Sequence, residues 1–177
     1  MFLKIRKKLK FAGYTYYKFH NGLSFVILKG FLPIPIFYTK KFLPLKAVAS
    51  TKFFCIIILP NFKNDLSVVS HEIIHIKQIF KTLGCHYILY NFSMKYRYRS
   101  ELHAYANQCV HLIIHSHIGM NIQLIEELID WVTEVLCETM NFSELISKDT
   151  ITVRKDFTKV LLKHFKLHKD EINNSSA

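Results

Sequence analysis

The chain has 177 residues, of which half are hydrophobic and 21% are charged, and its formal net charge is +11. This length suits one domain with a real core, and no apolar run approaches the roughly twenty residues of a membrane-spanning helix. The N-terminus is basic, as in a signal peptide, but Lys29, Pro33 and Pro35 interrupt the one candidate apolar segment after it. We therefore predict no signal peptide. We expect a single domain over residues 1–170 and a frayed polar tail at 171–177.

Acidic residues are distributed unevenly. Residues 1–64 contain no Asp or Glu, and most of the acids fall between Glu126 and Asp149. This pattern is typical either of a protein with an anionic partner or of the Lys-, Ile- and Asn-rich composition of an AT-rich genome. No nucleic-acid-binding motif accompanies the lysines. We therefore favour the compositional explanation and predict no nucleic-acid partner, with peripheral membrane contact as the less favoured alternative.

The first third of the chain predicts a small, mostly antiparallel sheet. Its first two aromatic and β-branched runs meet near Asn21-Gly22, the strongest short hairpin signal. Pro33 and Pro35 allow only an edge or irregular strand after them, because proline cannot donate a ladder hydrogen bond. Pro60 is expected to end the last strand or pair of strands. The predicted strand regions are 14–19, 23–28, 34–38 and 47–59.

The remainder of the chain predicts helices. Asn64 or Asp65 can cap the first of them, and Gly84 follows its last apolar residue. Ser100 is the expected N-cap of the second helix and Gly119 its end, after a tyrosine-rich connection. The predicted helices cover about 66–83, 100–118, 121–140 and 152–168, and the connection covers 85–99. The expected fold is thus α+β: an N-terminal sheet packed on one helix, followed by about three more helices.

The first helix contains the sequence His71-Glu72-Ile73-Ile74-His75, an HExxH motif. Two histidines four residues apart project from one face of a helix, so both can bind one tetrahedral zinc ion. The adjacent Glu72 can act as general base on the metal-bound water. An apolar stripe lies on roughly the opposite side of this helix, at Leu66, Val69, Ile73, Ile76, Phe80 and Leu83.

A catalytic zinc site needs a third protein ligand, and we predict Glu101 for this role. Glu101 lies on the next predicted helix, and Ala104 one turn later would let the two helices approach closely. His103 is the alternative ligand, about 200° away around the helix, so that only one of the two can face the metal. Gln78 shares the histidine face and could either support a ligand or be helix surface.

The HExxH motif, followed after about two dozen residues by Glu101-x-x-Ala104, resembles a minimal gluzincin metallopeptidase. The stretch from Leu66 to Tyr105 is similar to small phage and bacterial proteins of that group. The resemblance implies zinc ligands at His71, His75 and Glu101, a catalytic base at Glu72, and hydrolysis of a peptide or protein substrate. It also implies the cytoplasm of a bacterial or phage-infected cell. The scattered cysteines fit that location, because free thiols suit a reducing compartment.

Tyr105 departs from the gluzincin pattern, in which an Asp at this position orients a ligating histidine. A phenol can hydrogen-bond to a histidine but cannot supply a carboxylate's charge. The alternative function is therefore a weakly active or inactive zinc-containing binding module that contacts an anionic partner through its basic N-terminal third. Two further HxxxH pairs lack the central glutamate, and we expect structural or surface roles for them: His111 with His115 and His164 with His168. The sequence leaves the oligomeric state open.

Overall fold

The computed structural model confirms the α+β class and describes most of the chain. The described residues are 5–11, 14–19, 23–28, 33–44, 47–52, 54–115 and 121–169. The expected turn at Asn21-Gly22, the helix end at Gly119 and the tail at 171–177 lie outside them. The chain divides into two compact units, Met1–Glu72 and Ile73–Ala177, and the division falls inside the HExxH helix.

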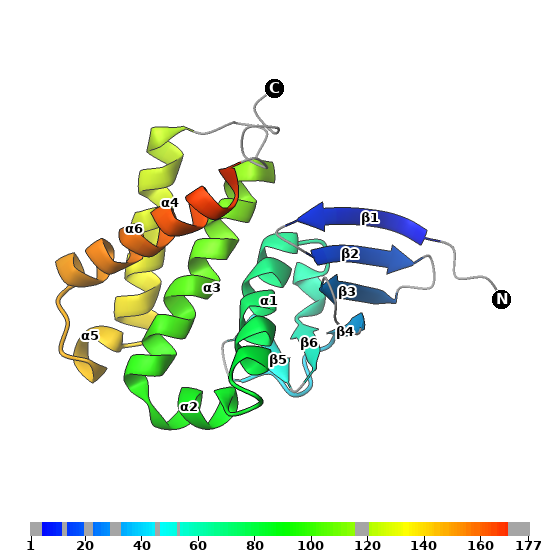
Figure 1. The fold of residues 1–177 in the computed structure, drawn as a ribbon, viewed down its shortest axis with the longest axis horizontal. Helices are drawn as coiled ribbons and strands as arrows, with labels where there is room; N and C mark the ends of the chain where they lie inside the picture. The colour runs from blue at the N-terminus through cyan, green and yellow to red at the C-terminus, as the bar shows by residue number, and fades with distance from the viewer. Residues whose placement is uncertain are drawn as a thin grey trace. The chain divides into compact units, whose positions relative to one another are not determined.

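The first unit contains a six-stranded sheet in the order β1-β2-β3-β4-β6-β5 (Figure 1). Every neighbouring pair is antiparallel except β4 with β6, which is parallel. This agrees with the predicted mostly antiparallel sheet, although β1 was not predicted. The strands are β1 (Ile5–Phe11), β2 (Tyr14–Phe19), β3 (Ser24–Leu28), β4 (Pro33–Tyr38), β5 (Ala49–Lys52) and β6 (Cys55–Ile58).

The prediction that residues 34–38 form an edge or irregular strand is wrong. β4 lies inside the sheet and pairs with both β3 and β6. Its ladder with β6 covers only Ile36 to Tyr38, after both prolines, so the missing N–H groups of Pro33 and Pro35 remove nothing from it. On the β3 side, an antiparallel ladder uses the N–H of every second residue only. Two prolines two residues apart can therefore both occupy the positions that donate nothing.

One face of the sheet forms the core of the first unit. The paired residues Tyr16, Val26 and Ile34 are each no more than 2% exposed, and Ile56 is fully buried. Thr51 is paired with Ile56 and so shares this face. Its hydroxyl donates hydrogen bonds to the backbone oxygen and the carboxylate of Glu72. The buried face of the sheet is therefore joined to the N-terminal half of the HExxH helix, within the same unit.

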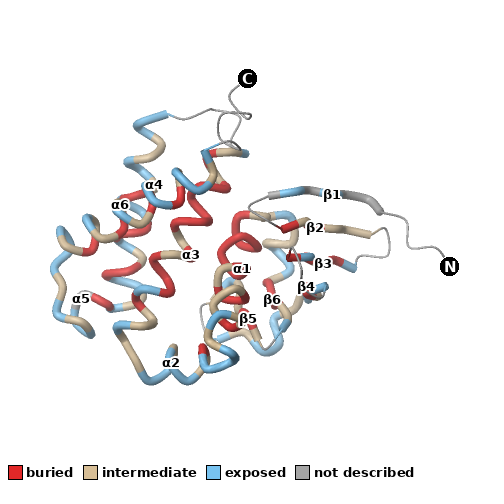
Figure 2. Tube along the Cα trace, in the orientation of Figure 1, coloured by how far each residue is buried: buried red, intermediate tan, exposed pale blue. Residues whose placement is uncertain are grey.

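The HExxH helix is α1 (Leu66–Lys81), which follows the 3-10 turn η1 (Pro60–Phe62). Asp65 caps it by accepting a hydrogen bond from the Ser67 N–H, and Gly84 lies beyond its end with φ of +87°. The predicted apolar stripe is buried at Val69, Ile73 and Ile76. Leu83 is an error in that stripe: it lies after the helix and is 93% exposed. The histidine side of α1 is buried as well, as the largely red tube of α1 in Figure 2 shows.

The second unit is helical. The prediction that residues 85–99 form a connection is wrong, because α2 occupies its first half and α3 already begins at Met94. α3 then continues through Ser100, which is consequently no N-cap. In Figure 1 α6 lies beside α3 and α4, and it packs against both. The elements are α2 (His86–Phe92), α3 (Met94–His115), α4 (Ile122–Glu134), the π-helical turn η2 (Val135–Thr139), α5 (Phe142–Leu145) and α6 (Thr150–Leu167).

Caps set the limits of the last two long helices. The side chain of Asn121 accepts a hydrogen bond from the Gln123 N–H at the start of α4, and Asp149 does the same for Thr152 in α6.

The described helices include none that is both long and apolar enough to cross a bilayer. All four cysteines are free thiols, as predicted.

Candidate metal centre

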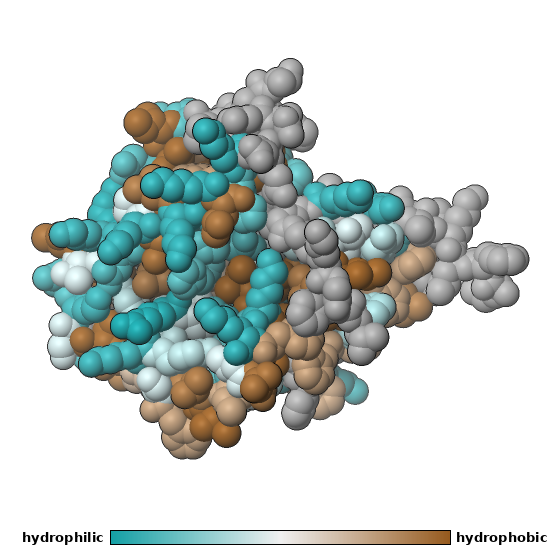
Figure 3. Space-filling model, viewed as in Figure 1, coloured by the Kyte–Doolittle hydropathy of each residue, from teal (hydrophilic) through white to brown (hydrophobic). Residues whose placement is uncertain are grey.

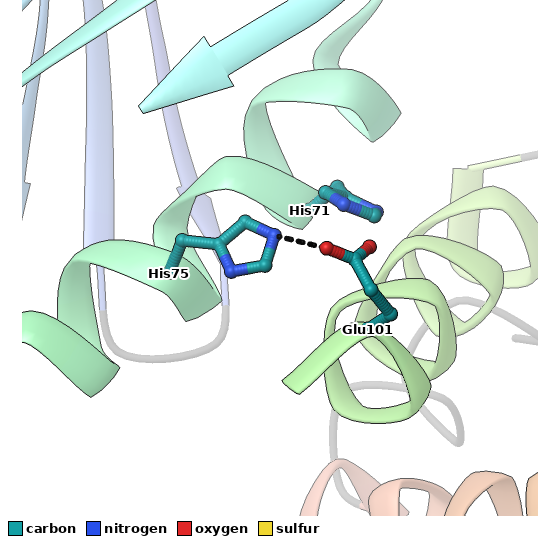
Figure 4. Close-up of side chains that lie close together, drawn as sticks. All are labelled: His71, His75 and Glu101. Atoms are coloured by element: carbon teal, nitrogen blue, oxygen red, sulfur yellow. Dashed lines mark ion pairs between the residues drawn. The ribbon is translucent and has the colours of Figure 1, made fainter. Parts of the chain in front are cut away.

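α1 and α3 bring together His71, His75 and Glu101 (Figure 4). Each side chain offers one ligand atom, and these atoms all lie within 4.8 Å of one another. The three residues are 9%, 7% and 2% exposed, respectively. Among the residues that the structure describes, this is the single group of three or more His, Cys, Asp or Glu side chains able to hold a metal ion. The structure thus contains a buried group that could bind a metal.

The donor set suits zinc: two imidazole nitrogens and one carboxylate oxygen. His75 Nε2 lies 3.5 Å from Glu101 Oε1. Ligand atoms of a tetrahedral site with bonds of about 2.0–2.1 Å lie roughly 3.3 Å apart, so this pair needs little movement to share an ion. Three protein ligands would leave a fourth position open, the arrangement of catalytic rather than structural zinc sites.

His103, the alternative third ligand, lies elsewhere. Its Nδ1 is 3.0 Å from Nε2 of His164 on α6, so it joins α3 to α6 instead of facing α1. Burial lowers the pKa of His103, and nearby Lys163 and Lys81 lower it further. Two neutral imidazoles can share one hydrogen bond, because each has one N–H donor and one acceptor nitrogen. The arrangement therefore brings Glu101, and not His103, to the histidines of α1.

Gln78 and Ser100 orient the ring of His75. Gln78 Oε1 lies 3.1 Å from His75 Nδ1, and Ser100 Oγ lies 3.2 Å from the same nitrogen. The amide oxygen of Gln78 can only accept, so Nδ1 must donate to it, and in the neutral ring the lone pair is then on Nε2. That lone pair is on the nitrogen nearest to Glu101. The neighbours thus favour the tautomer that a metal ligand needs.

Tyr90 of α2 fixes the carboxylate of Glu101. Its hydroxyl donates a hydrogen bond to Glu101 Oε1. Burial and the neighbouring Glu101 charge raise the pKa of Tyr90, so the phenol keeps its proton and remains a donor. Arg97 lies over the Tyr90 ring, 5.1 Å from its centroid. The sequence placed Tyr90 in a loop, and its spacing from Glu101 gave no signal of this contact.

His86 borders the centre without joining the group of three. Its ring centroid is 5.7 Å from that of His75, and its Nδ1 is 2.9 Å from the hydroxyl of Tyr96. Burial and then the charge of His75 lower the pKa of His86 to about 4, against a smaller opposite effect of Glu101. His86 is therefore a neutral imidazole at neutral pH.

The predicted base, Glu72, is 5% exposed and lies in α1 between the two histidines in sequence. Thr51 Oγ1 donates to its Oε2 over 2.8 Å. Tyr105, one turn of α3 after Glu101, packs edge-on against Trp131 of α4 with ring centroids 5.8 Å apart. Its position is therefore used for packing α3 against α4, while Gln78 and Ser100 hydrogen-bond to His75.

The other histidine pairs form no larger ligand group within the described ranges. The rings of His111 and His115 lie 4.4 Å apart on α3, and those of His164 and His168 lie 6.4 Å apart on α6.

Comparison with protein-family models, with curated proteins and with solved structures finds no match.

Proposed function

We propose that the protein is a zinc-dependent metallopeptidase of the gluzincin type. The observation that supports this most is the buried group of His71, His75 and Glu101, together with a buried glutamate, Glu72, that directly follows His71 in the sequence and is not needed as a ligand. When bound, zinc would polarise the scissile carbonyl and increase the acidity of a water molecule. Three ligands leave room for both substrate and water.

Glu72 would act as the general base. It would take a proton from the attacking water and give it to the leaving amine, the usual role of a carboxylate at this place in the motif. The hydrogen bond from Thr51 holds one carboxylate oxygen, Oε2, and leaves Oε1 to exchange the proton. Gln78 and Ser100 would meanwhile hold the His75 ring in the orientation and tautomer in which Nε2 can bind the metal.

An extended peptide is the substrate class that the first unit favours. β5 stands at the end of the described strand order, so one of its sides offers backbone N–H and C=O groups to a further strand. Thr51 belongs to β5 and contacts Glu72 directly. A substrate chain that pairs with β5 would therefore run beside the residue that transfers the proton.

The test compares Glu72→Gln with wild type on an unstructured protein and a peptide library. The substitution preserves shape but removes the base, so cleavage should fall by about two orders of magnitude or more while zinc content is retained. Glu134→Gln is the matched control, because Glu134 is an exposed glutamate of α4. Wild-type cleavage should also stop when a chelator is added.

The second candidate function is a zinc-containing binding module without peptidase activity. The packing of Tyr105 against Trp131 favours it, because the carboxylate expected beside the ligands is missing. Equal activity of wild type and Glu72→Gln, or a zinc-loaded wild type that cleaves no substrate, would contradict the peptidase proposal and support the module.

A further inference from the structure

The outer face of α6 gathers positive charge. Four exposed lysines lie there within about 80° of one another around the helix: Lys155, Lys159, Lys163 and Lys166. The buried residues Val153, Phe157 and Leu161 lie on the opposite side and are at most 1% exposed. We call Lys155, Lys159, Lys163 and Lys166 the lysine face. The space-filling view in Figure 3 has hydrophilic side chains with hydrophobic ones between them over α6.

The charge of the lysine face is not neutralised within the described part of the chain, where none of its lysines forms an ion pair with an acid. The one acid of α6, Asp156, accepts hydrogen bonds from Lys148 and Tyr98. Of the four acids of α4, Glu126 and Asp130 both pair with Arg154, and Glu127 accepts a hydrogen bond from Gln123. The four ammonium groups are therefore available to an external anion.

Two exposed apolar residues accompany the lysines. Ile151 is 79% exposed and Leu162 is 54% exposed, and both fall within about 40° of Lys155 around the helix. They line, together with the lysines, a shallow groove of about 640 Å³ along α6. Exposed apolar side chains are unfavourable on a surface that contacts only water. At a membrane surface, in contrast, lysines bind the charged headgroups and apolar side chains contact the acyl chains.

We propose that the lysine face docks on an anionic lipid surface. The lysines extend over about 17 Å of helix, and compact ammonium groups suit lipid phosphates and carboxylates. Ile151 and Leu162 would enter the boundary between headgroups and acyl chains. Nucleic-acid binding fits less well, because the face contains neither an aromatic side chain for stacking nor an arginine free of acidic partners. None of the residues of this surface is one of the candidate metal ligands, so the proposal does not depend on the peptidase.

Sedimentation of the full-length protein with phosphatidylcholine vesicles tests the proposal. Binding should require phosphatidylserine in the vesicles, weaken as salt is added and survive a chelator. Lys155→Gln/Lys159→Gln/Lys163→Gln should weaken it about 100-fold, since each lysine near such a surface contributes about fivefold. Lys10→Gln/Lys40→Gln/Lys41→Gln removes the same charge from exposed positions of the first unit and should change binding only a few-fold.

Leu162→Ser is the second variant and leaves the charge unchanged. It should weaken vesicle binding several-fold, because the exposed apolar side chain is lost. An equal loss in both triple variants would overturn the proposal and assign binding to net charge. Equal binding to neutral vesicles would also overturn it. Tight, saturable DNA or RNA binding that the α6 variant loses and Leu162→Ser retains would identify a nucleic-acid surface instead.

Discussion

The carboxylate of Glu101 lies on the face of α3 that meets the histidines, and His103 two residues later lies on another. If the three-residue group binds zinc, His75→Ala and Glu101→Ala should each lose the metal, because two ligands remain. His103→Ala is the control and should keep about one zinc per chain. Metal content of the purified variants measures this. Zinc retained in Glu101→Ala but lost in His103→Ala would show that the third ligand is His103.

A second residue-scale prediction concerns Gln78. Gln78→Ala removes the acceptor of the His75 Nδ1 proton and leaves only Ser100 beside that nitrogen. Loss of such a supporting hydrogen bond costs about 10–100-fold in metal affinity, and we expect a decrease in that range. Competition with a zinc indicator dye measures the affinity. Gln123→Ala, at an exposed position of α4, should leave it unchanged.

The ligand candidates could be found from sequence because helical periodicity alone places residues 71 and 75 on one face. The residues that orient them could not. Thr51 reaches Glu72 across 21 positions of sequence, and Ser100 reaches His75 across 25. Such contacts depend on tertiary packing, and neither residue type is unusual enough to signal its partner. For Gln78, which shares the histidine face, the sequence left two roles open: support of a ligand or helix surface.

At the scale of elements, strands and helices with regular apolar patterns were predicted, and those without were missed. β2, β3, α1 and α6 show such patterns. α2 buries only His86 along its whole length, so no apolar periodicity marks it. β1 has the sequence IRKKLKF, in which basic residues with low strand preference predominate, and its pairing with β2 is what makes it a strand. The inner position of β4 depends on a non-local parallel pairing.

The contact between α3 and α6 should make stability depend on pH. Burial, followed by the charges of His103, His168, Lys77 and Lys163, lowers the pKa of His164 from 6.5 to about 3. Between these two values the unfolded chain binds more protons at this site than the folded chain does. The contribution of His164 is therefore complete above about pH 6.5 and is lost as the pH falls toward 3.

Urea denaturation between pH 7 and pH 4.5 measures this dependence. The free energy of unfolding should fall with pH by up to about 1.4 kcal/mol per unit from this one group. His164→Gln should flatten the slope even if it lowers stability at pH 7. Gln123→Ala, which removes no titratable group from an exposed position of α4, should leave the slope as it is. An unchanged slope in His164→Gln would mean that His164 is not buried as a neutral imidazole.

At the scale of the whole molecule, a bound metal should stabilise the fold. A ligand that binds only the folded state at 100 times its dissociation constant adds about 2.7 kcal/mol. For a chain of this size that corresponds to an increase of about 5–10 °C in the unfolding temperature. Thermal denaturation with zinc and with chelator measures the difference, and His75→Ala should show none. An equal response of His75→Ala would place the stabilising ion elsewhere.

The two ends of the sheet differ in how they meet other chains. An open sheet edge is a template for pairing between molecules and hence for aggregation, and charged side chains on an edge strand oppose it. β1, at one end of the described strand order, has four basic residues in seven, whereas β5 at the other end has four residues and only Lys52 charged. Two β1 edges would repel each other. The positive charge at the start of the chain therefore protects one edge against fibril-like association, while the uncharged part of β5 stays accessible.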